Sequence, residues 1–209
     1  KKIFTYIVKH AKENVMSVKN SYTTADYIEW DTAINLMHKL YKDGEYRMSL
    51  LIGCGIYFGL RISDILQLRW DMLLHAPTFV IIEKKTQKRR EVKINSSFQG
   101  HIKDCYRALD VKDEQEKCFI SPRGGVYSIQ RINVLLKEIK QKYNLKSVKN
   151  FSSHSLRKSF GRHVYERADT NAEMALALLS ELFNHSSISI TKRYLGIRHE
   201  ELMECYDLL

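Results

Sequence analysis

Two pairs of side chains and one isolated arginine in this sequence are of types that act on phosphate esters. His154 and Arg157 are three residues apart, so on a helix both side chains point in one direction. His185 precedes Tyr194 by nine residues, and Arg61 lies far upstream. Arginine stays charged and can donate two parallel hydrogen bonds to phosphate, whereas histidine moves protons and a deprotonated tyrosine can attack phosphorus. Each signal alone is weak, because most such residues lie on surfaces or in cores.

A basic run supplies a further group of candidates. The β-branched and aromatic stretch 78–83 and the alternating stretch 91–94 predict two strands, so the residues between them form the tip of a β-hairpin. Most cations of this tip are expected to grip a nucleic acid backbone. One lysine could also protonate a departing oxygen. The basic residues of the run are Lys84, Lys85, Lys88, Arg89 and Arg90.

The charge balance favours a polyanionic partner. The 209 residues carry 34 Lys and Arg against 24 Asp and Glu, which gives a formal net charge of +10. Among polyanions, nucleic acid, either DNA or RNA, is the leading candidate. With 44% hydrophobic residues and two prolines, the composition is that of a globular protein able to bury one good core, and not that of a disordered chain.

Cysteine usage and hydropathy bear on the compartment. Cys54, Cys105, Cys118 and Cys205 are scattered and lack the spacing of metal ligands, which predicts reduced thiols. No apolar run approaches the ~20 residues that span a bilayer, and no charged-then-apolar leader is visible. We therefore expect a cytoplasmic protein without a membrane partner, which joins the nucleoid when it is bound to DNA.

The start of the chain predicts two unequal parts. Apolar residues at helical spacing over 1–18 and a polar break after them predict a helix and a linker across residues 1–22. Because the sequence begins with Lys1 and not Met, we expect a piece of a longer chain. Residues 1–22 would then be the tail of a separate N-terminal DNA-binding domain, and residues 23–209 a catalytic domain.

Helical spacing dominates residues 23–209. Thr24 or Asp26 could cap a helix that runs through Leu40, and a second helix is predicted from about Tyr46 to Phe58. From residue 129 onward the pattern is again helical almost to the end. Together with the single hairpin, these stretches predict a fold that is mostly α with a small antiparallel β-sheet.

Breaks in the pattern place several of the candidates at helix ends. Gly59 interrupts an apolar run, so the chain should turn there and restart as a helix near Arg61. Ser152 or Ser153 could cap the helix that carries His154. Further breaks are expected near 184–186 and at Gly196, on either side of Tyr194.

The order of these signals resembles the tyrosine recombinase (phage integrase) family over about residues 23–209. The matching elements are Gly-Leu-Arg-Ile-Ser-Asp around Arg61, the hairpin lysine, His-Ser-Leu-Arg from His154, and the segment from His185 to Tyr194. The Tyr-Leu-Gly-Ile ending is most similar to integrases of bacterial conjugative or mobilisable transposons. The resemblance implies the tyrosine recombinase catalytic-domain fold and a site-specific recombinase, expected to integrate and excise a mobile element.

The family resemblance implies a role for each matched side chain. Tyr194 would be the nucleophile that forms a 3′-phosphotyrosine intermediate, and Arg61 and Arg157 would stabilise charge on the non-bridging phosphate oxygens. His154 would be the general base or proton relay. His185 would contact the scissile phosphate. Because the covalent bond keeps its energy for religation, no ATP is required, and no metal or other cofactor is expected.

Three lysines of the hairpin could fill the position of the family's general acid. In the family it often stands just before Thr or Gly, so Lys85, which precedes Thr86, is the preferred general acid for the departing 5′-oxygen. Lys84 and Lys88 remain alternatives. Asp64, three residues beyond Arg61, matches an acidic family position and is expected to orient neighbouring groups without reacting itself.

Two positions depart from the family pattern. Asn184 stands before His185 where Gly is usual, and Lys158 stands after Arg157 where His is common. If residue 184 closes a helix in the left-handed region, Asn is the next most tolerant type after Gly, so the geometry should survive. Neither change removes a reacting group.

The same resemblance implies partners. Double-stranded DNA would be the substrate, the full-length protein is expected to form a tetramer on DNA, and accessory DNA-bending proteins could assist. The tail from His199 carries Leu202, Met203, Tyr206 and Leu209 at helical spacing, an apolar stripe that needs a partner surface. We expect it to dock on a neighbouring protomer, although packing on its own domain is an equally simple outcome.

Three other functions compete with a mobile-element integrase. A chromosome-dimer resolvase or an invertase of the same family would use identical chemistry on differently arranged sites. A type IB topoisomerase shares the chemistry but relaxes supercoils without exchanging strands. A DNA-binding relative without catalysis is also conceivable, but all the reacting residue types are present here, which argues against it.

Overall fold

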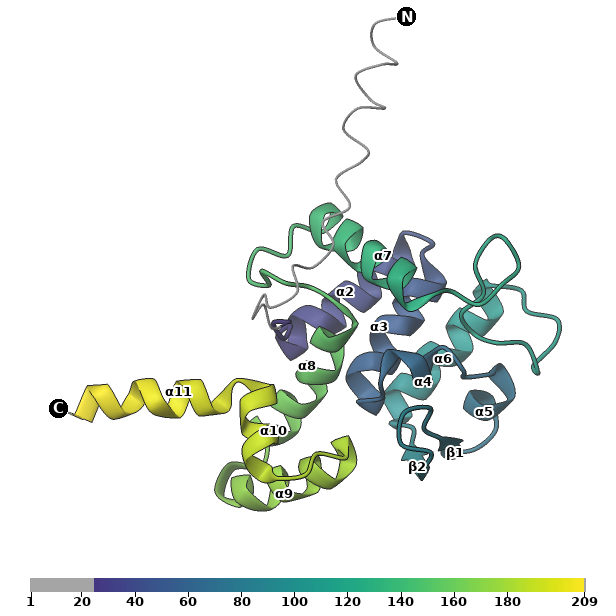
Figure 1. Cartoon of the computed structure of the whole chain (residues 1–209). Helices are drawn as coiled ribbons and strands as arrows, with labels where there is room; N and C mark the ends of the chain where they lie inside the picture. The colour runs from purple at the N-terminus through teal and green to yellow at the C-terminus, as the bar shows by residue number, and fades with distance from the viewer. Residues whose placement is uncertain (1–24, 209) are drawn as a thin grey trace, which may run out of the picture.

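A computed structural model describes residues 25–208 of the chain. Apolar residues recur at helical spacing through most of this part, and these stretches form helices that surround one hydrophobic core (Figure 1). The helices are α2 (Trp30–Lys42), α3 (Tyr46–Phe58), α4 (Ile62–Ile65), α5 (Trp70–Leu74), α6 (Ser96–Ala108), α7 (Ile129–Lys142), α8 (Ser153–Glu166), α9 (Ala172–Phe183), α10 (Ile188–Leu195) and α11 (Ile197–Glu204), with short 3₁₀ helices η1 (Asp169–Asn171) and η2 (Cys205–Leu208).

Helix α3 forms the centre of the core. Its residues from Met48 to Ile56 and Phe58 are buried, and it packs against α2, α6 and α8. Two glycines allow these close contacts, because a Cβ at Gly53 would lie 2.1 Å from Phe98 on α6, and a Cβ at Gly55 would lie 2.6 Å from Leu156 on α8. Any larger residue at these positions would push α6 or α8 away from the centre.

The turn predicted after α3 is present. Gly59 ends α3 in the left-handed region with φ +56°, and Arg61 then stands directly before the short helix α4. The predicted start of the first helix is wrong, because α2 begins at Trp30. Thr24 lies outside the described residues, and the Asp26 carboxylate accepts hydrogen bonds from the backbone N–H groups of Lys149 and Asn150 at 2.8 and 2.9 Å.

The predicted hairpin is the two-stranded antiparallel sheet β1 (Thr78–Ile82) and β2 (Arg89–Lys93). Its register pairs Thr78 with Lys93 and Ile82 with Arg89, so residues 83–88 make up the tip. Phe79 belongs to the core, where its ring packs edge-on against Phe58 of α3 at 5.2 Å between centroids. One face of the sheet therefore anchors the hairpin, and the basic tip extends beyond it.

A smaller second core joins α8, α9 and α10. Its buried members are Leu176, Leu179, Phe183, Leu195 and Ile197. Gly161 on α8 makes this packing close, because a Cβ there would lie 2.6 Å from Leu195 and 3.1 Å from Phe183. The first turns of α11 contact this core through Ile197 and through the ion pairs Arg162–Glu200 and Lys192–Glu201, and the end of α11 projects away from the other helices (Figure 1). The tail is helical as predicted, and the described side chains of Met203 and Tyr206 are exposed.

The described part of the chain confirms a mostly helical fold with one small antiparallel sheet. Among residues 25–208, no helix is both long enough and apolar enough to cross a bilayer. Cys54, Cys105 and Cys118 are free and buried, as expected of reduced thiols. The predicted helix and linker over residues 1–22 lie outside the described residues, and so does the side chain of Cys205.

Candidate active site

The carboxyl end of α9 gathers three arginines that are far apart in the sequence. The Phe183 carbonyl oxygen accepts hydrogen bonds from Nη2 of Arg61 at 2.9 Å and from Nη2 of Arg157 at 3.2 Å. The Leu182 carbonyl oxygen accepts from Nη1 of Arg90 at 3.2 Å. The last carbonyls of a helix have no partner within it and carry the negative end of its dipole, so guanidinium groups are well suited to cap them.

Local structure explains why Arg61 and Arg157 reach the same place. Arg61 leaves the left-handed turn at Gly59 in extended conformation, directly before α4. Arg157 lies in the first turns of α8, which begins with a capping box between Ser152 and Ser155. The Arg157 guanidinium is buried and lies over the Phe183 ring at 4.4 Å, which adds a cation–π contact.

A buried carboxylate ties the hairpin to these arginines. Glu83, directly after β1, is fully buried, and its Oε2 atom accepts hydrogen bonds from Arg61 at 3.0 Å and Asn184 at 3.0 Å. Thr86 donates to the same oxygen at 2.7 Å, and Arg90 lies 3.4 Å from Oε1. Burial alone would raise the pKa of Glu83, but the Thr86 hydrogen bond and both arginines outweigh it and lower the pKa.

The Tyr194 hydroxyl lies next to this cluster and is buried. The ring packs edge-on against Phe183 at 5.6 Å and His185 at 5.3 Å between centroids. Its Oη atom and Nη1 of Arg157 are both buried and have no hydrogen-bond partner among the described residues. Burial raises the pKa of Tyr194 to about 12, although Arg157 and Arg61 oppose the shift. Tyr194 is therefore protonated at neutral pH, and the nearby cations favour its anion.

Burial lowers the pKa of Arg157 to about 10, and the neighbouring cations Arg61 and Arg90 lower it further. The side chain still carries its charge at neutral pH. It is thus a buried cation beside a buried hydroxyl, and both have donor hydrogens without an acceptor among the described residues. An anionic oxygen is the acceptor that would satisfy both groups at once.

Both candidate histidines are held in the neutral form. Partial burial lowers the pKa of His154, and so do Arg157, Lys158, Arg61 and Lys85. Partial burial, Arg157 and Arg61 likewise lower the pKa of His185. A neutral imidazole can accept a proton, which suits a general base. His185 Nδ1 lies 3.0 Å from the Thr191 hydroxyl, a contact that orients its ring toward α10.

The three candidate lysines occupy different positions on the hairpin tip. The backbone N–H of Lys84 donates to Asp64 Oδ1 at 2.9 Å. Asp64 therefore holds the start of the hairpin tip in place, which agrees with an orienting role for this carboxylate. The Lys88 ammonium donates to Asn184 Oδ1 at 2.8 Å. Lys85 is exposed, and it lies close enough to lower the pKa of His154. The structure therefore brings Lys85 to the same side of the molecule as the arginines and His154.

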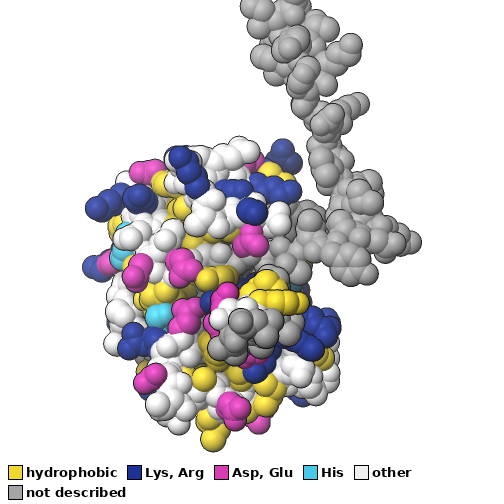
Figure 2. All heavy atoms as spheres, turned by 90° about the vertical axis from the view of Figure 1, so that its left-hand side faces the viewer, with side chains coloured by type: hydrophobic (Ala, Val, Ile, Leu, Met, Phe, Trp, Pro, Cys, Tyr) yellow, Lys and Arg dark blue, Asp and Glu magenta, His cyan; other side chains and the backbone are white. Residues whose placement is uncertain are grey.

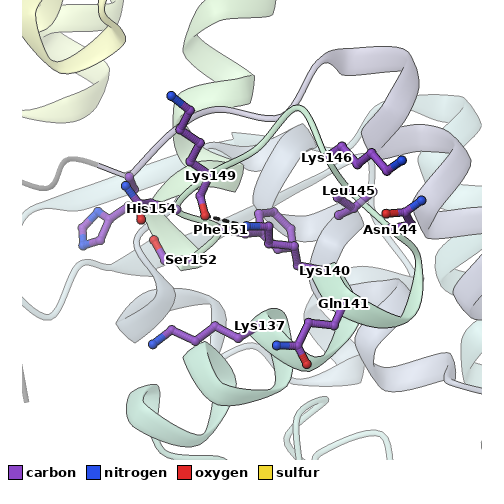
Figure 3. A pocket seen from close by; sticks show the side chains of 12 residues that line it. Lys137, Lys140, Gln141, Asn144, Leu145, Lys146, Lys149, Phe151, Ser152 and His154 are labelled. Carbon is purple, nitrogen blue, oxygen red and sulfur yellow. Dashed lines mark hydrogen bonds between the residues drawn. The ribbon is translucent and has the colours of Figure 1, made fainter. Parts of the chain in front are cut away.

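A basic pocket of about 760 Å³ adjoins His154 (Figure 3). Lys137 on α7 and Lys149 on the following loop line it, and their side chains extend toward the side on which His154 lies. Lys140 is directed inward and donates to the Lys149 carbonyl at 2.6 Å, which fixes the loop. The pocket thus extends the positive charge of the site from the arginines toward α7.

Several residues of this site were not predicted as parts of it. Glu83 ends the predicted strand just before the basic run, and nothing near it in the sequence indicated its role. Arg90 was expected to grip a nucleic acid backbone but points inward, where it also donates to the Phe58 carbonyl at 2.8 Å. Lys158 is buried with its ammonium 5.4 Å from the centre of the Tyr194 ring. Within residues 25–208, no group of three His, Cys, Asp or Glu side chains is placed to hold a metal ion.

Comparison with known proteins identifies the family. The sequence profile described as "Phage integrase family" matches residues 27–201, which include all six candidate residues. This chain belongs to the phage integrase family. Among curated phage integrase relatives, "Probable integrase/recombinase YoeC" of Bacillus subtilis is 34% identical over 154 residues, covering 73% of this chain and 78% of that protein. "Tyrosine recombinase XerC" of Xylella fastidiosa is 28% identical over 149 residues, covering 71% of this chain and 48% of that protein.

Solved structures of family members share the fold. A XerA recombinase aligns with a TM-score of 0.65 at 19% identity, covering 90% of this chain and 66% of the other. The Tn1549 transposon integrase in complex with transposon right end DNA aligns with a TM-score of 0.60 at 16% identity, covering 90% and 68%. This chain thus spans about half the length of XerC and about two thirds of these two solved chains.

Proposed function

We propose that this chain carries the catalytic machinery of a site-specific DNA recombinase. The observation that supports this most strongly is the convergence of two arginines on the Phe183 carbonyl beside a buried Tyr194 hydroxyl that has no hydrogen-bond partner among the described residues. Fixed positive charge is needed where a phosphate gains negative charge in a transition state. Arg61 and Arg157 meet that need next to a nucleophile.

In the proposed cleavage step, Tyr194 Oη attacks phosphorus while the bond from phosphorus to the 5′-oxygen breaks. His154 accepts the phenolic proton, directly or through a relay, because its lowered pKa keeps it neutral. Arg61 and Arg157, held at the Phe183 carbonyl through Nη2, donate their other N–H groups to the non-bridging oxygens, and His185 donates to the same phosphate. The product is a 3′-phosphotyrosine, which reverses when a 5′-hydroxyl attacks it.

The departing 5′-oxygen needs a proton, and we assign Lys85 as its donor. Lys85 is exposed on the hairpin tip, whereas the Lys88 ammonium is engaged with Asn184. Lys84 is also exposed and remains the alternative. The whole scheme uses side chains of this chain and the bond energy of the phosphotyrosine, so neither ATP nor a metal ion takes part in it.

Double-stranded DNA is the proposed substrate. The hairpin tip and the pocket beside His154 both carry exposed lysines, which add positive charge near the candidate site. Contacts of this kind bind the phosphate backbone and release counterions, so affinity should fall steeply with salt. The XerH and Tn1549 chains that share this fold were solved with DNA bound, which supports the same partner here.

We propose integration and excision of a mobile element as the biological role. The 34% identity to a protein named as a probable integrase/recombinase supports it. The tyrosine recombinases XerC and XerD among the relatives favour the alternative, a resolvase of the same family. Strand exchange by the full-length protein between two circular plasmids, compared with exchange within one, would separate the two roles.

We also propose that four copies assemble on DNA through the tail. Met203 and Tyr206 of the tail are exposed, and so are Met174 and Leu178 of α9. On the face from which α11 projects, exposed apolar side chains lie among charged ones (Figure 2). The exposed apolar side chains of the tail could pack on the exposed apolar face of α9 in a neighbouring protomer, so that each protomer both gives and receives a tail. Removing residues 200–209 should abolish recombination by the full-length protein; unchanged recombination would refute the exchange.

The test of the proposed activity is covalent attachment. The full-length protein would first select its site from random-sequence duplexes, and a nicked suicide form of that site would then trap the adduct. Tyr194→Phe should abolish the adduct and leave DNA binding nearly intact, because only the nucleophilic oxygen is lost. An adduct formed at the full rate by this variant would show that Tyr194 is not the nucleophile.

A further inference from the structure

The side chain of Asn184 joins three parts of the candidate site. Its Nδ2 donates to Glu83 at 3.0 Å, and its Oδ1 accepts from the Lys88 ammonium at 2.8 Å. Glu83 and Lys88 stand at the two ends of the hairpin tip, whereas Asn184 closes α9 directly before His185. A cleft of about 480 Å³ lies between hairpin and α9, lined by all three residues. The amide spans this cleft.

The chemistry of position 184 leaves little choice of residue. The backbone is left-handed there, with φ 54° and ψ 47°, which excludes most side chains and favours Gly, Asn or Asp. The partners are a carboxylate on one side and an ammonium on the other, so the group between them must donate to the first and accept from the second. Asn does both; Asp would place a second carboxylate against Glu83, and Gly would make neither contact.

We propose that Asn184 is a positioning residue, which holds the hairpin tip so that Lys85 can protonate the leaving oxygen. This inference rests on the proposed function. The tip carries Lys85 between two residues that Asn184 contacts. Without the bridge, Glu83 would still reach the end of α9 indirectly, through Arg61 and the Phe183 carbonyl, but the Lys88 end of the tip would lose its hydrogen bond to Asn184. Asn184 thus links the proton donor to the helix end that sets the positions of Arg61 and Arg157.

The proposal is tested with Asn184→Gly on two forms of the selected DNA site. Gly keeps the left-handed turn and the Phe183 carbonyl but removes both side-chain bonds. Cleavage of ordinary DNA at saturating concentration should slow by about 10- to 100-fold, the range expected for losing hydrogen bonds to charged groups. A substrate with sulfur in place of the bridging 5′-oxygen needs no proton donor, so this variant should cleave it at close to the wild-type rate.

Two further variants show where the effect arises. Asn184→Gly combined with Lys85→Ala should be no slower on ordinary DNA than Lys85→Ala alone, because both changes disable one proton transfer. Arg89→Met is the matched control, since Arg89 is exposed on the same hairpin and has no hydrogen bond or ion pair to α9 among those of the described residues. It should change the rates on the two substrates by the same factor, as loss of a backbone contact would.

The outcomes separate this inference from the proposed function. Equal slowing of Asn184→Gly on both substrates, or no slowing on either, would overturn the positioning role. Asn184→Asp, which retains the shape but reverses one donor, should be at least as slow on ordinary DNA; a wild-type rate there would also overturn it. Failure of the wild-type protein to form an adduct on either substrate would instead refute the recombinase assignment itself.

Discussion

The buried carboxylate of Glu83 offers the sharpest test of how the site is held. Its side chain is 0% exposed, and its partners Arg61 and Arg90 are only 18% and 14% exposed. Glu83→Gln keeps the shape but leaves both guanidinium groups without their counter-charge. Removing one member of a buried ion pair costs about 3–5 kcal/mol. For a domain of this size that lowers the melting temperature by about 6 to 20 °C.

Urea unfolding at neutral pH, followed by circular dichroism, measures this loss directly. Glu91→Gln is the matched control, because Glu91 is an exposed carboxylate on the same hairpin, and its change should lie within about 0.5 kcal/mol. Combining Glu83→Gln with Arg90→Met should cost less than the sum of the two, since the second change removes a charge that the first left unpaired. An unfolding free energy for Glu83→Gln within about 0.5 kcal/mol of wild type would refute this reasoning.

Three further predictions concern the reacting groups and their support. Lys85→Ala should cleave ordinary DNA very slowly yet cleave the sulfur-bridged substrate near the wild-type rate; selective rescue of Lys84→Ala or Lys88→Ala instead would move the general acid to that residue. Because burial raises the pKa of Tyr194 from 10.0 to about 12, its folded form favours the proton, and stability is lost as pH rises between these values. Between pH 10 and 12 in urea titrations, the free energy of unfolding of wild type should therefore fall by about 2 kcal/mol more than that of Tyr194→Phe, and parallel curves would contradict the buried hydroxyl. Gly161→Ala should lower the melting temperature and slow adduct formation together, because its Cβ would lie 2.6 Å from Leu195, next to Tyr194; an unchanged melting temperature would show that α8 and α10 are not in close contact.

Local features of the sequence predicted much of this fold. Gly59 predicted the turn before Arg61, and Asn184 predicted the left-handed end of α9, because Gly and Asn are the residue types that most readily adopt a left-handed backbone. The β-branched stretch 78–83 and the alternating stretch 91–94 predicted the two strands of the hairpin, because strand formation also depends on the local residue pattern. Candidate residues were chosen by type and by order along the chain, and these too are local properties.

Contacts between residues far apart in the sequence could not be predicted from such local patterns. Glu83 meets Asn184 across 101 positions, and Arg90 meets Leu182 across 92. Asp26 was expected to cap a helix, but it binds backbone N–H groups more than 120 positions away. In each case the residue type allowed a local role, and the tertiary fold supplied a partner that the neighbouring sequence does not reveal.

The two candidate catalytic arginines share an acceptor that belongs to the main chain. A substitution at residue 183 can alter the ring that packs against Arg157, but it cannot delete the carbonyl oxygen that both guanidinium groups bind. During sequence divergence, this anchor therefore persists as long as α9 ends where it does. Glu83 is the opposite case, because a single codon change removes it. Because the Phe183 ring is buried in the second core, large apolar substitutions at Phe183 should be tolerated sooner than any substitution at Glu83, and deep mutational scanning of both positions would reveal that asymmetry.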